Sequence, residues 1–168
     1  MKKTILSTTF LLLFLLASCA SNSKVSTRTK EISLGSDDFV GLFFNIIEID
    51  DSGDKQYVVS AAFSYEDKEK LEIVLEKEKP LFIAIDQEIV QLQPIPNKYK
   101  YVKKKTPQRG ERLLHIQMND YKITKTVLKK IANSSSTVVK IPASPHKNKG
   151  FDGVFRKDGM IQITEFIE

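Results

Sequence analysis

The chain contains two histidines and one cysteine, side chains that often serve as general bases and nucleophiles. His115 lies in a stretch of alternating residues, on the face opposite Leu114 and Ile116. A carboxylate such as Asp120 or Glu111 could orient it as a general base. A half-buried histidine that bonds to a backbone carbonyl would produce the same pattern. His115 is therefore a candidate for catalysis with a structural alternative.

Several common catalytic and binding patterns are missing from the sequence. The Gly-x-Ser-x-Gly pattern of serine hydrolases, the His-Glu-x-x-His pattern of zinc hydrolases and glycine-rich phosphate loops do not occur. Two His and one Cys are too few for a His/Cys zinc cage, and one Cys allows no internal disulfide. The aspartates around Gly53 lack the spacing of an EF-hand and predict a turn. We therefore expect no metal, no cofactor and no enzymatic activity.

A basic and aromatic run between residues 98 and 112 is the strongest candidate contact surface. Its members are Lys98, Tyr99, Lys100, Tyr101, Lys103, Lys104, Lys105, Arg109 and Arg112. The cations attract anionic partners and the tyrosine rings offer stacking faces, so the run could bind anionic lipid headgroups, an anionic glycan or an acidic protein. The alternative is a mobile loop or an exposed edge strand, whose solvated lysines discourage pairing with other sheets.

The first 19 residues have the layout of an export signal. The cationic head Met1-Lys2-Lys3 precedes an apolar run over residues 5–16. A transmembrane helix needs about 20 apolar residues, whereas a run of about 12 is typical of a secretory signal. The run ends in the tetrapeptide Leu16-Ala17-Ser18-Cys19.

This tetrapeptide resembles the lipobox of bacterial lipoprotein precursors, in which an apolar residue and two small residues precede an invariant cysteine. The resemblance covers the leader alone. It implies cleavage after Ser18, a diacylglyceryl group on the Cys19 thiol and acylation of the new amine. Each buried CH₂ contributes about 0.8 kcal/mol, so several acyl chains on one residue hold a domain durably on a membrane. Ala20, in place of an aspartate, favours the outer membrane over the inner one. A plain signal peptide cleaved beside a cysteine is the alternative.

Cleavage would leave a mildly basic protein. Loss of residues 1–18 removes two Lys and no acidic residue, so the net charge falls from +5 to +3, which does not indicate nucleic-acid binding. Residues 19–37 are rich in Ser and Thr and predict a flexible tether after the lipidated cysteine, although Ile32 and Leu34 could begin an edge strand. Residues 38–168 are predicted to form a single globular domain.

Alternating apolar residues predict strands through most of this domain. Residues 39–49 are apolar on both faces and predict a central strand in the interior of a sheet. A turn at residues 50–54 then leads into a hairpin partner. Residues 81–85 and 89–92 predict a second hairpin.

Two helices are also expected. The apolar spacing over residues 123–131 predicts an amphipathic helix that Thr124 or Asp120 could cap, and the C-terminal segment favours a helix over a strand. The predicted fold class is α+β, a mainly antiparallel sheet of about six to eight short strands with one or two packed helices. A small sandwich or a barrel would fit the same pattern.

Together with the leader, these features predict a lipid-anchored bacterial envelope protein that acts as a non-enzymatic binding or structural module. Its partners would be the membrane, through the N-terminal lipid, and envelope proteins or anionic glycans and lipids, with no nucleic acid. An envelope hydrolase that uses His115 and a periplasmic carrier or chaperone for an apolar ligand are the alternatives. The hydrolase needs an acidic partner beside His115, and the carrier needs an apolar cavity of roughly 300 Å³ or more.

Overall fold

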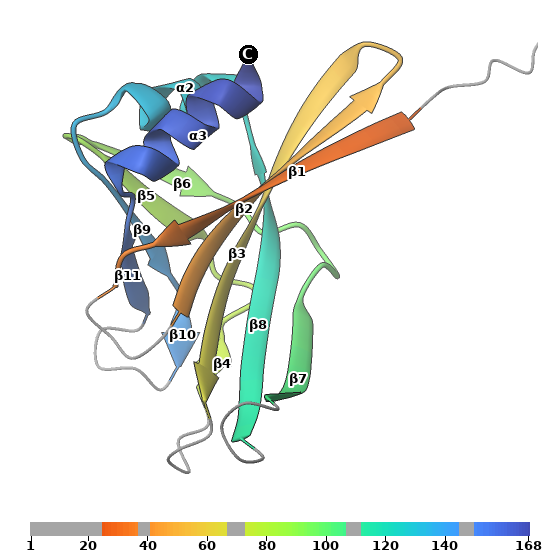
Figure 1. Cartoon of the computed structure of the whole chain (residues 1–168), viewed down its shortest axis with the longest axis vertical. Coiled ribbons are helices and arrows are strands. Elements are labelled where there is room, and N and C mark those ends of the chain that lie inside the picture. The colour runs from red at the N-terminus through yellow and green to blue at the C-terminus, as the bar shows by residue number, and fades with distance from the viewer. Residues whose placement is uncertain (1–24, 37–40, 67–72, 107–111, 145–149) are drawn as a thin grey trace, which may run out of the picture.

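The computed structural model of the chain describes residues 25–36, 41–66, 73–106, 112–144 and 150–168 (Figure 1). These residues contain eleven strands and two helices, and every strand pair is antiparallel. The prediction of a mainly antiparallel sheet with two helices is therefore confirmed. The strands are more numerous than the predicted six to eight, and the longest has 13 residues, so they are not uniformly short.

The larger sheet has five strands in the order β1-β2-β3-β8-β7. They are β1 (Val25–Leu34), β2 (Gly41–Asp51), β3 (Asp54–Glu66), β8 (Arg112–Ile123) and β7 (Lys100–Thr106). Between β2 and β3, Ser52 has a φ of 54° and Gly53 a φ of 98°. Two successive positive φ values are typical of a two-residue hairpin turn that matches the twist of its strands. The predicted turn and hairpin are confirmed.

Strand β1 occupies most of the segment predicted to be a flexible tether. It pairs with β2 along its whole length, from Val25 opposite Asp51 to Leu34 opposite Leu42. Ile32 and Leu34 are buried at its end, and the β-branched threonines before them suit an extended backbone. The tether prediction is thus wrong for residues 25–34. The alternative, an edge strand at Ile32 and Leu34, is correct, and the strand begins earlier than predicted, at Val25.

The smaller sheet has four strands in the order β11-β9-β5-β6. They are β11 (Phe151–Val154), β9 (Thr137–Ile141), β5 (Leu81–Ile85) and β6 (Glu88–Leu92). A separate short pair joins β4 (Val74–Leu75) to β10 (Ala143–Ser144). The predicted hairpin of residues 81–85 and 89–92 is confirmed as β5 and β6.

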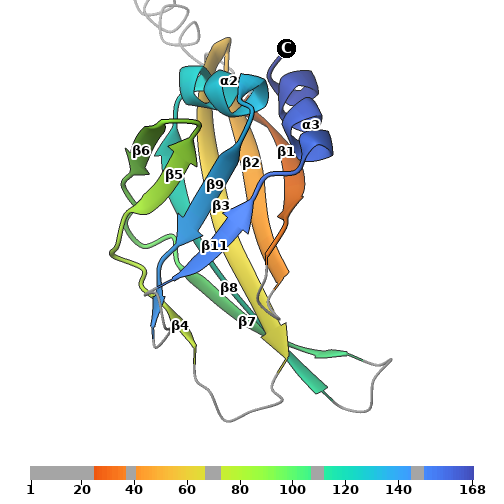
Figure 2. The same ribbon diagram turned by 90° about the vertical axis from the view of Figure 1, so that its left-hand side faces the viewer.

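The two larger sheets lie face to face in two layers (Figure 2). Their facing side chains form the core, which includes Phe44 and Phe63 from the larger sheet and Ile83 and Val139 from the smaller one. Among the described strands neither sheet closes on itself, because β1 and β7 are the edges of one and β11 and β6 the edges of the other. The architecture is therefore an open sandwich and not a closed barrel.

Both helices lie at the same end of the sandwich (Figure 1). Helix α2 (Lys125–Asn133) is capped by Thr124, whose side chain accepts a hydrogen bond from the Val127 amide. Thr124 is one of the two caps predicted from the sequence. Asp120, the other predicted cap, belongs to β8 instead. Helix α3 (Lys157–Ile167) confirms the C-terminal helix. Neither described helix has the length and apolar character needed to cross a membrane.

Candidate functional site

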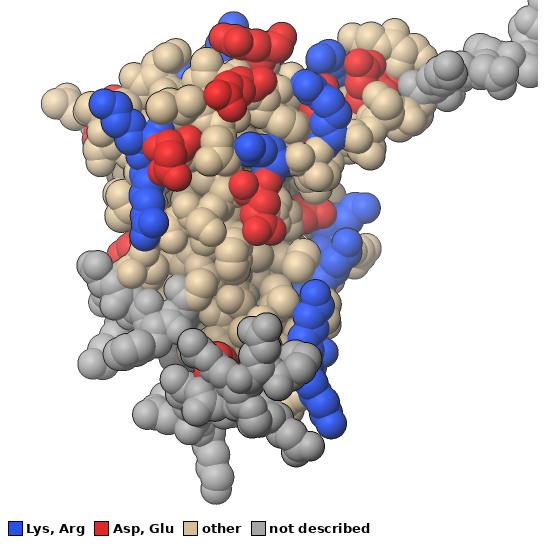
Figure 3. All heavy atoms as spheres, in the orientation of Figure 1, with Lys and Arg blue, Asp and Glu red and all other residues tan. Residues whose placement is uncertain are grey.

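The predicted contact surface lies at one edge of the larger sheet. Its described lysines, Lys98, Lys100, Lys103, Lys104 and Lys105, are named here the basic edge. Figure 3 shows a line of Lys and Arg side chains down the side of the molecule where β7 lies. Residues 100–106 of the run therefore form an edge strand. An exposed edge strand was one of the two structures predicted for this run, and a mobile loop was the other. Arg109 lies outside the described residues, and of Arg112 only the backbone, at the start of β8, is described.

The basic edge presents lysines to both faces of the sheet. Lys103 pairs with the buried His115, so Lys103 projects from the inner face of the larger sheet. Strand alternation places Tyr101 and Lys105 on that inner face, and Lys100 and Lys104 on the outer face. The cations thus surround the edge and do not cover a single face.

None of the five lysines forms an ion pair with another described residue, and all five are exposed. The Lys103 ammonium lies over the Tyr101 ring, 5.5 Å from its centroid, in a cation–π contact. Like charges gathered along one strand create a positive potential that attracts an anionic partner and raises its association rate. The edge is consequently available for binding.

A row of stacked rings supports this edge from inside. The His115 ring lies 4.7 Å from the Tyr65 ring and 5.9 Å from the Tyr101 ring, centroid to centroid. The Tyr101 hydroxyl is 2.6 Å from His115 Nδ1, within hydrogen-bond distance. Phe63 continues the row into the core. His115 therefore fixes Tyr101, which is 44% exposed, at the surface.

Asp120, predicted as a possible partner of His115, lies elsewhere. The two residues are five positions apart in β8, so they point to opposite faces and are separated by about 17 Å along the strand. Glu111, the other predicted partner, lies outside the described residues. The His115 side chain is buried among rings with Tyr101 on its Nδ1, a geometry that fits a structural histidine better than a general base.

Two buried side-chain amides of β8, which were not predicted from the sequence, hold neighbouring segments, and one of them bonds Tyr99. Gln117 Oε1 accepts hydrogen bonds from the Leu75 amide at 2.8 Å and from the Tyr99 hydroxyl at 3.0 Å. Asn119 Nδ2 donates to the Lys77 carbonyl at 2.7 Å. Burial raises the pKa of Tyr99, which keeps its hydroxyl a donor. These bonds tie the segment containing β4 to the larger sheet.

Two surface grooves of about 500 and 520 Å³ meet at Tyr99. Both are open to solvent and both are bordered by Lys77 and Glu78. Such mixed, open grooves differ from the enclosed apolar cavity that a carrier requires. In the described part of the chain, buried side chains of both sheets form one core cluster.

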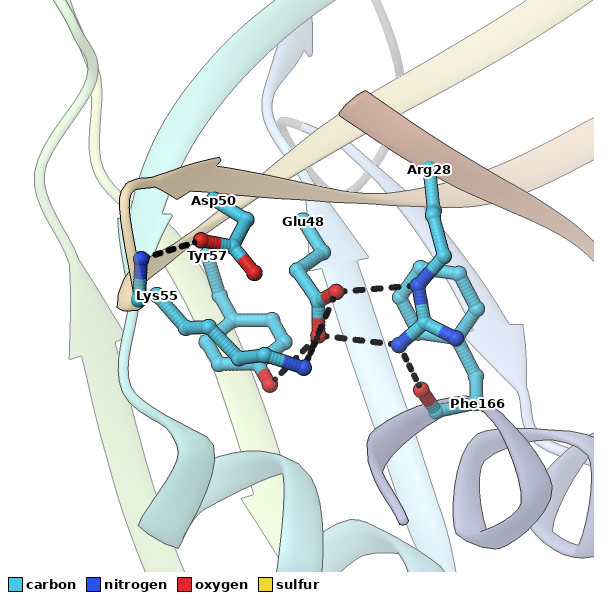
Figure 4. A network of polar contacts seen from close by, with 7 residues as sticks. Arg28, Glu48, Asp50, Lys55, Tyr57 and Phe166 are labelled. Carbon is cyan, nitrogen blue, oxygen red and sulfur yellow. Dashed lines mark hydrogen bonds and ion pairs between the residues drawn. The ribbon is translucent and has the colours of Figure 1, made fainter. Parts of the chain in front are cut away.

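A second polar cluster lies at the other end of the larger sheet, beneath α3 (Figure 4). The Arg28 guanidinium donates to both Glu48 carboxylate oxygens, at 2.9 and 3.0 Å, and to the Phe166 carbonyl at 3.0 Å. The Tyr57 hydroxyl donates to Glu48 at 2.8 Å, and the Lys55 ammonium lies 3.4 Å from it. Strands β1, β2 and β3 and the end of α3 meet at this one carboxylate.

The electrostatics of this cluster indicate a structural role. Glu48 is 3% exposed, and the hydrogen bonds from Arg28, together with those from Tyr57 and Lys55, lower its pKa to about 2 against the opposing effect of burial. Burial, with the hydrogen bond to Glu48, raises the pKa of Tyr57 to about 12. A carboxylate that already accepts bonds from several donors is poorly suited to take up a proton in catalysis.

Asp50, beside the β2–β3 turn, also has a structural role. Asp50 Oδ1 accepts a hydrogen bond from the Gly53 amide at 2.8 Å, which closes the turn. In the described residues no group of three or more His, Cys, Asp or Glu side chains is arranged to hold a metal ion.

Comparison of the chain with protein-family models, curated proteins and solved structures found no match. The leader and the surfaces of the folded domain are therefore the features that bear on function.

Proposed function

We propose that this protein is a bacterial envelope lipoprotein, held in the membrane by acyl chains on Cys19, whose folded domain acts as a non-enzymatic binding module. The observation that carries the proposal is the tetrapeptide Leu16-Ala17-Ser18-Cys19 at the end of a short apolar run. Ala20 favours the outer membrane as the location. The basic edge supports binding as the activity of the domain.

A lipid on Cys19 would lie close to the end of the domain at which β1 begins. Strand β1 begins at Val25, so the link from Cys19 consists of residues 20–24. Fully extended, such a link reaches about 20 Å. Val25 pairs with Asp51 beside the tip of the β2–β3 hairpin, so this tip is the end of the sandwich nearest the anchor.

The basic edge lies toward the opposite end of the larger sheet. Lys103 pairs with His115, which pairs with Tyr65, and Tyr65 is 11 residues along β3 from its start at Asp54. A strand rises about 3.3 Å per residue, so roughly 35 Å separates the hairpin tip from this level. The arrangement favours an acidic protein or an anionic glycan of the envelope over lipid headgroups beside the anchor.

Replacement of the acceptor cysteine tests the anchor. Full-length chain carrying Cys19→Ala should leave the membrane fraction or accumulate as uncleaved precursor, because the thiol that receives the lipid is gone. Ser21→Ala, two residues away, is the matched control and should remain in the membrane fraction at the processed size. A Cys19→Ala protein that is processed and held in the membrane like the unsubstituted chain would contradict the proposal.

A further inference from the structure

The outer face of the larger sheet carries apolar side chains that belong to no core. Strand alternation places Phe43 and Ile47 of β2, Val58 of β3, Ile116 and Met118 of β8, and Val102 of β7 on this face. None of them is a member of the core between the two sheets, which is built from the alternate residues of the same strands. The larger sheet therefore carries apolar residues on both faces, and its outer face also carries Asp120 and Lys122 of β8.

No described strand or helix covers this outer face. Figures 1 and 2 show the smaller sheet and both helices on the other side of the larger sheet. Most of the outer apolar side chains are nevertheless only half-exposed, because they shield one another. Antiparallel sheets with one face in solvent normally alternate apolar and polar residues, and a pattern that is apolar on both sides is typical of a sheet covered on both sides.

Two buried polar atoms at the centre of this face lack partners among the described residues. Ser60 pairs with Asn45 across β3 and β2, and both side chains point outward. Ser60 is 4% exposed, and neither its Oγ nor Asn45 Oδ1 has a hydrogen-bond partner. A buried polar atom without a partner costs about 1–3 kcal/mol. Both atoms are already shielded within one copy, so they mark the tightly packed centre of the face.

We propose that this outer face packs against the same face of a second copy of the chain to form a two-fold symmetric dimer. Five strands about 4.8 Å apart and about ten residues long give a face of roughly 800 Å², the area that each partner contributes to a standard stable interface. The dimer then has four layers of sheet, and the outer faces of the two copies lie in its interior. The inference does not depend on lipidation of Cys19.

The residues of this face suit self-association. An isologous contact places a patch against itself, so a residue near its centre lies close to its own copy. Strand β3 is the central strand of five, so its outward residues, such as the half-buried Val58, lie nearest this centre. A two-fold axis along the strands also places the edge that carries Lys100 over the edge that carries Glu31. A bilayer would instead place Asp120 and Lys122, which share this face, against hydrocarbon.

The first test measures mass. Full-length protein extracted in mild detergent should have twice the monomer mass by light scattering after correction for bound detergent. Met118→Lys should halve that mass, since it places a charge in the contact, and Ile47→Lys is the second variant if the first does not fold. The matched control is Val154→Lys, an exposed valine on the outer face of the smaller sheet, which should stay dimeric. A monomeric unsubstituted chain, or a dimer that survives both lysine substitutions, would overturn the proposal.

The second test traps the contact in the cell. Val58→Cys, a half-buried outward position of the central strand β3, should form a disulfide-linked dimer on a non-reducing gel under mild oxidation, whereas Ser135→Cys, an exposed position after α2, should not. The unsubstituted chain, whose one cysteine is Cys19, is the control for any disulfide-linked dimer formed through that residue. Equal crosslinking of both variants, or adducts of Val58→Cys with a different protein only, would also overturn the proposal.

Discussion

The two ends of the larger sheet use charge in opposite ways. At the end beneath α3, the buried Glu48 carboxylate accepts hydrogen bonds from Arg28, Tyr57 and Lys55. At the other end the lysines of the basic edge are exposed and make no ion pair within the described residues. Charge that is buried and fully paired specifies how the strands and helix meet, whereas exposed unpaired charge is left for a partner. Substitutions at the two ends should therefore affect different properties.

The largest expected effect comes from removing the buried charge. Glu48→Gln should lower the free energy of unfolding by about 2 kcal/mol, because Arg28 and Tyr57 lose their charged acceptor in a buried site. Urea unfolding measures this as a shift of the midpoint. The matched control is Glu88→Gln, since Glu88 is paired with Lys130 at the surface and should cost less than about 0.5 kcal/mol. Equal losses in the two variants would contradict the structural role of Glu48.

Acid should reproduce part of that loss in the unsubstituted protein. The pKa of Glu48 is lowered in the folded state to about 2 from an ordinary value of 4.5, so its contribution is complete above pH 4.5 and disappears as the pH falls toward 2. Unfolding midpoints of the unsubstituted protein and Glu48→Gln should therefore converge over this range. A constant difference between pH 5 and pH 3 would show that Glu48 does not titrate in this way.

An intermediate effect is expected beside the basic edge. Tyr101→Phe removes the hydroxyl that bonds His115 Nδ1 and should cost about 1 kcal/mol of unfolding free energy. The stacked ring remains, so the far-ultraviolet circular dichroism should be unchanged. A loss of less than about 0.3 kcal/mol would mean that this hydrogen bond contributes little to positioning Tyr101.

The smallest effect on stability, with a large effect on binding, is expected at the basic edge. Replacement of Lys103, Lys104 and Lys105 with Glu should change the unfolding free energy by less than about 0.5 kcal/mol. Each lysine contributes about 1 kcal/mol near an anionic surface, so reversing all three should weaken association by about 100-fold or more. Crosslinking in the native envelope, followed by identification of the captured partners, measures this loss.

A triple variant of the same charge change, with Lys125, Lys129 and Lys157 of the two helices replaced by Glu, serves as the control. It should keep the captured partners of the unsubstituted protein. If both triple variants lose them equally, net charge and not the basic edge determines the association.

Local patterns in the sequence predicted the elements with strong periodicity. The Thr124 cap and the apolar spacing after it identified α2, and the Ser52-Gly53 turn between alternating residues identified the β2–β3 hairpin. Strand β1 was predicted only as an alternative at Ile32 and Leu34, because its serines and threonines resemble a linker. It extends over ten residues, from Val25 to Leu34, and pairs with β2 along this length. Tertiary pairing decided the state of that segment.

The polar residues that organise the interior were also missed, although a signal existed. Glu48 shares its strand face with Phe44 and Ile46, and Gln117 and Asn119 share theirs with Tyr121. A polar residue in register with core residues is a candidate buried hydrogen-bonding group. Their partners, such as Arg28 and the Phe166 carbonyl, lie far away in the sequence, so only the fold could identify them.

Metabolic labelling with a palmitate analogue tests the anchored state most directly. In cells that express the full-length chain, the label should travel with the processed protein and should be lost in Cys19→Ala. A processed protein without label, or equal labelling of the two chains, would contradict a lipid anchor on Cys19.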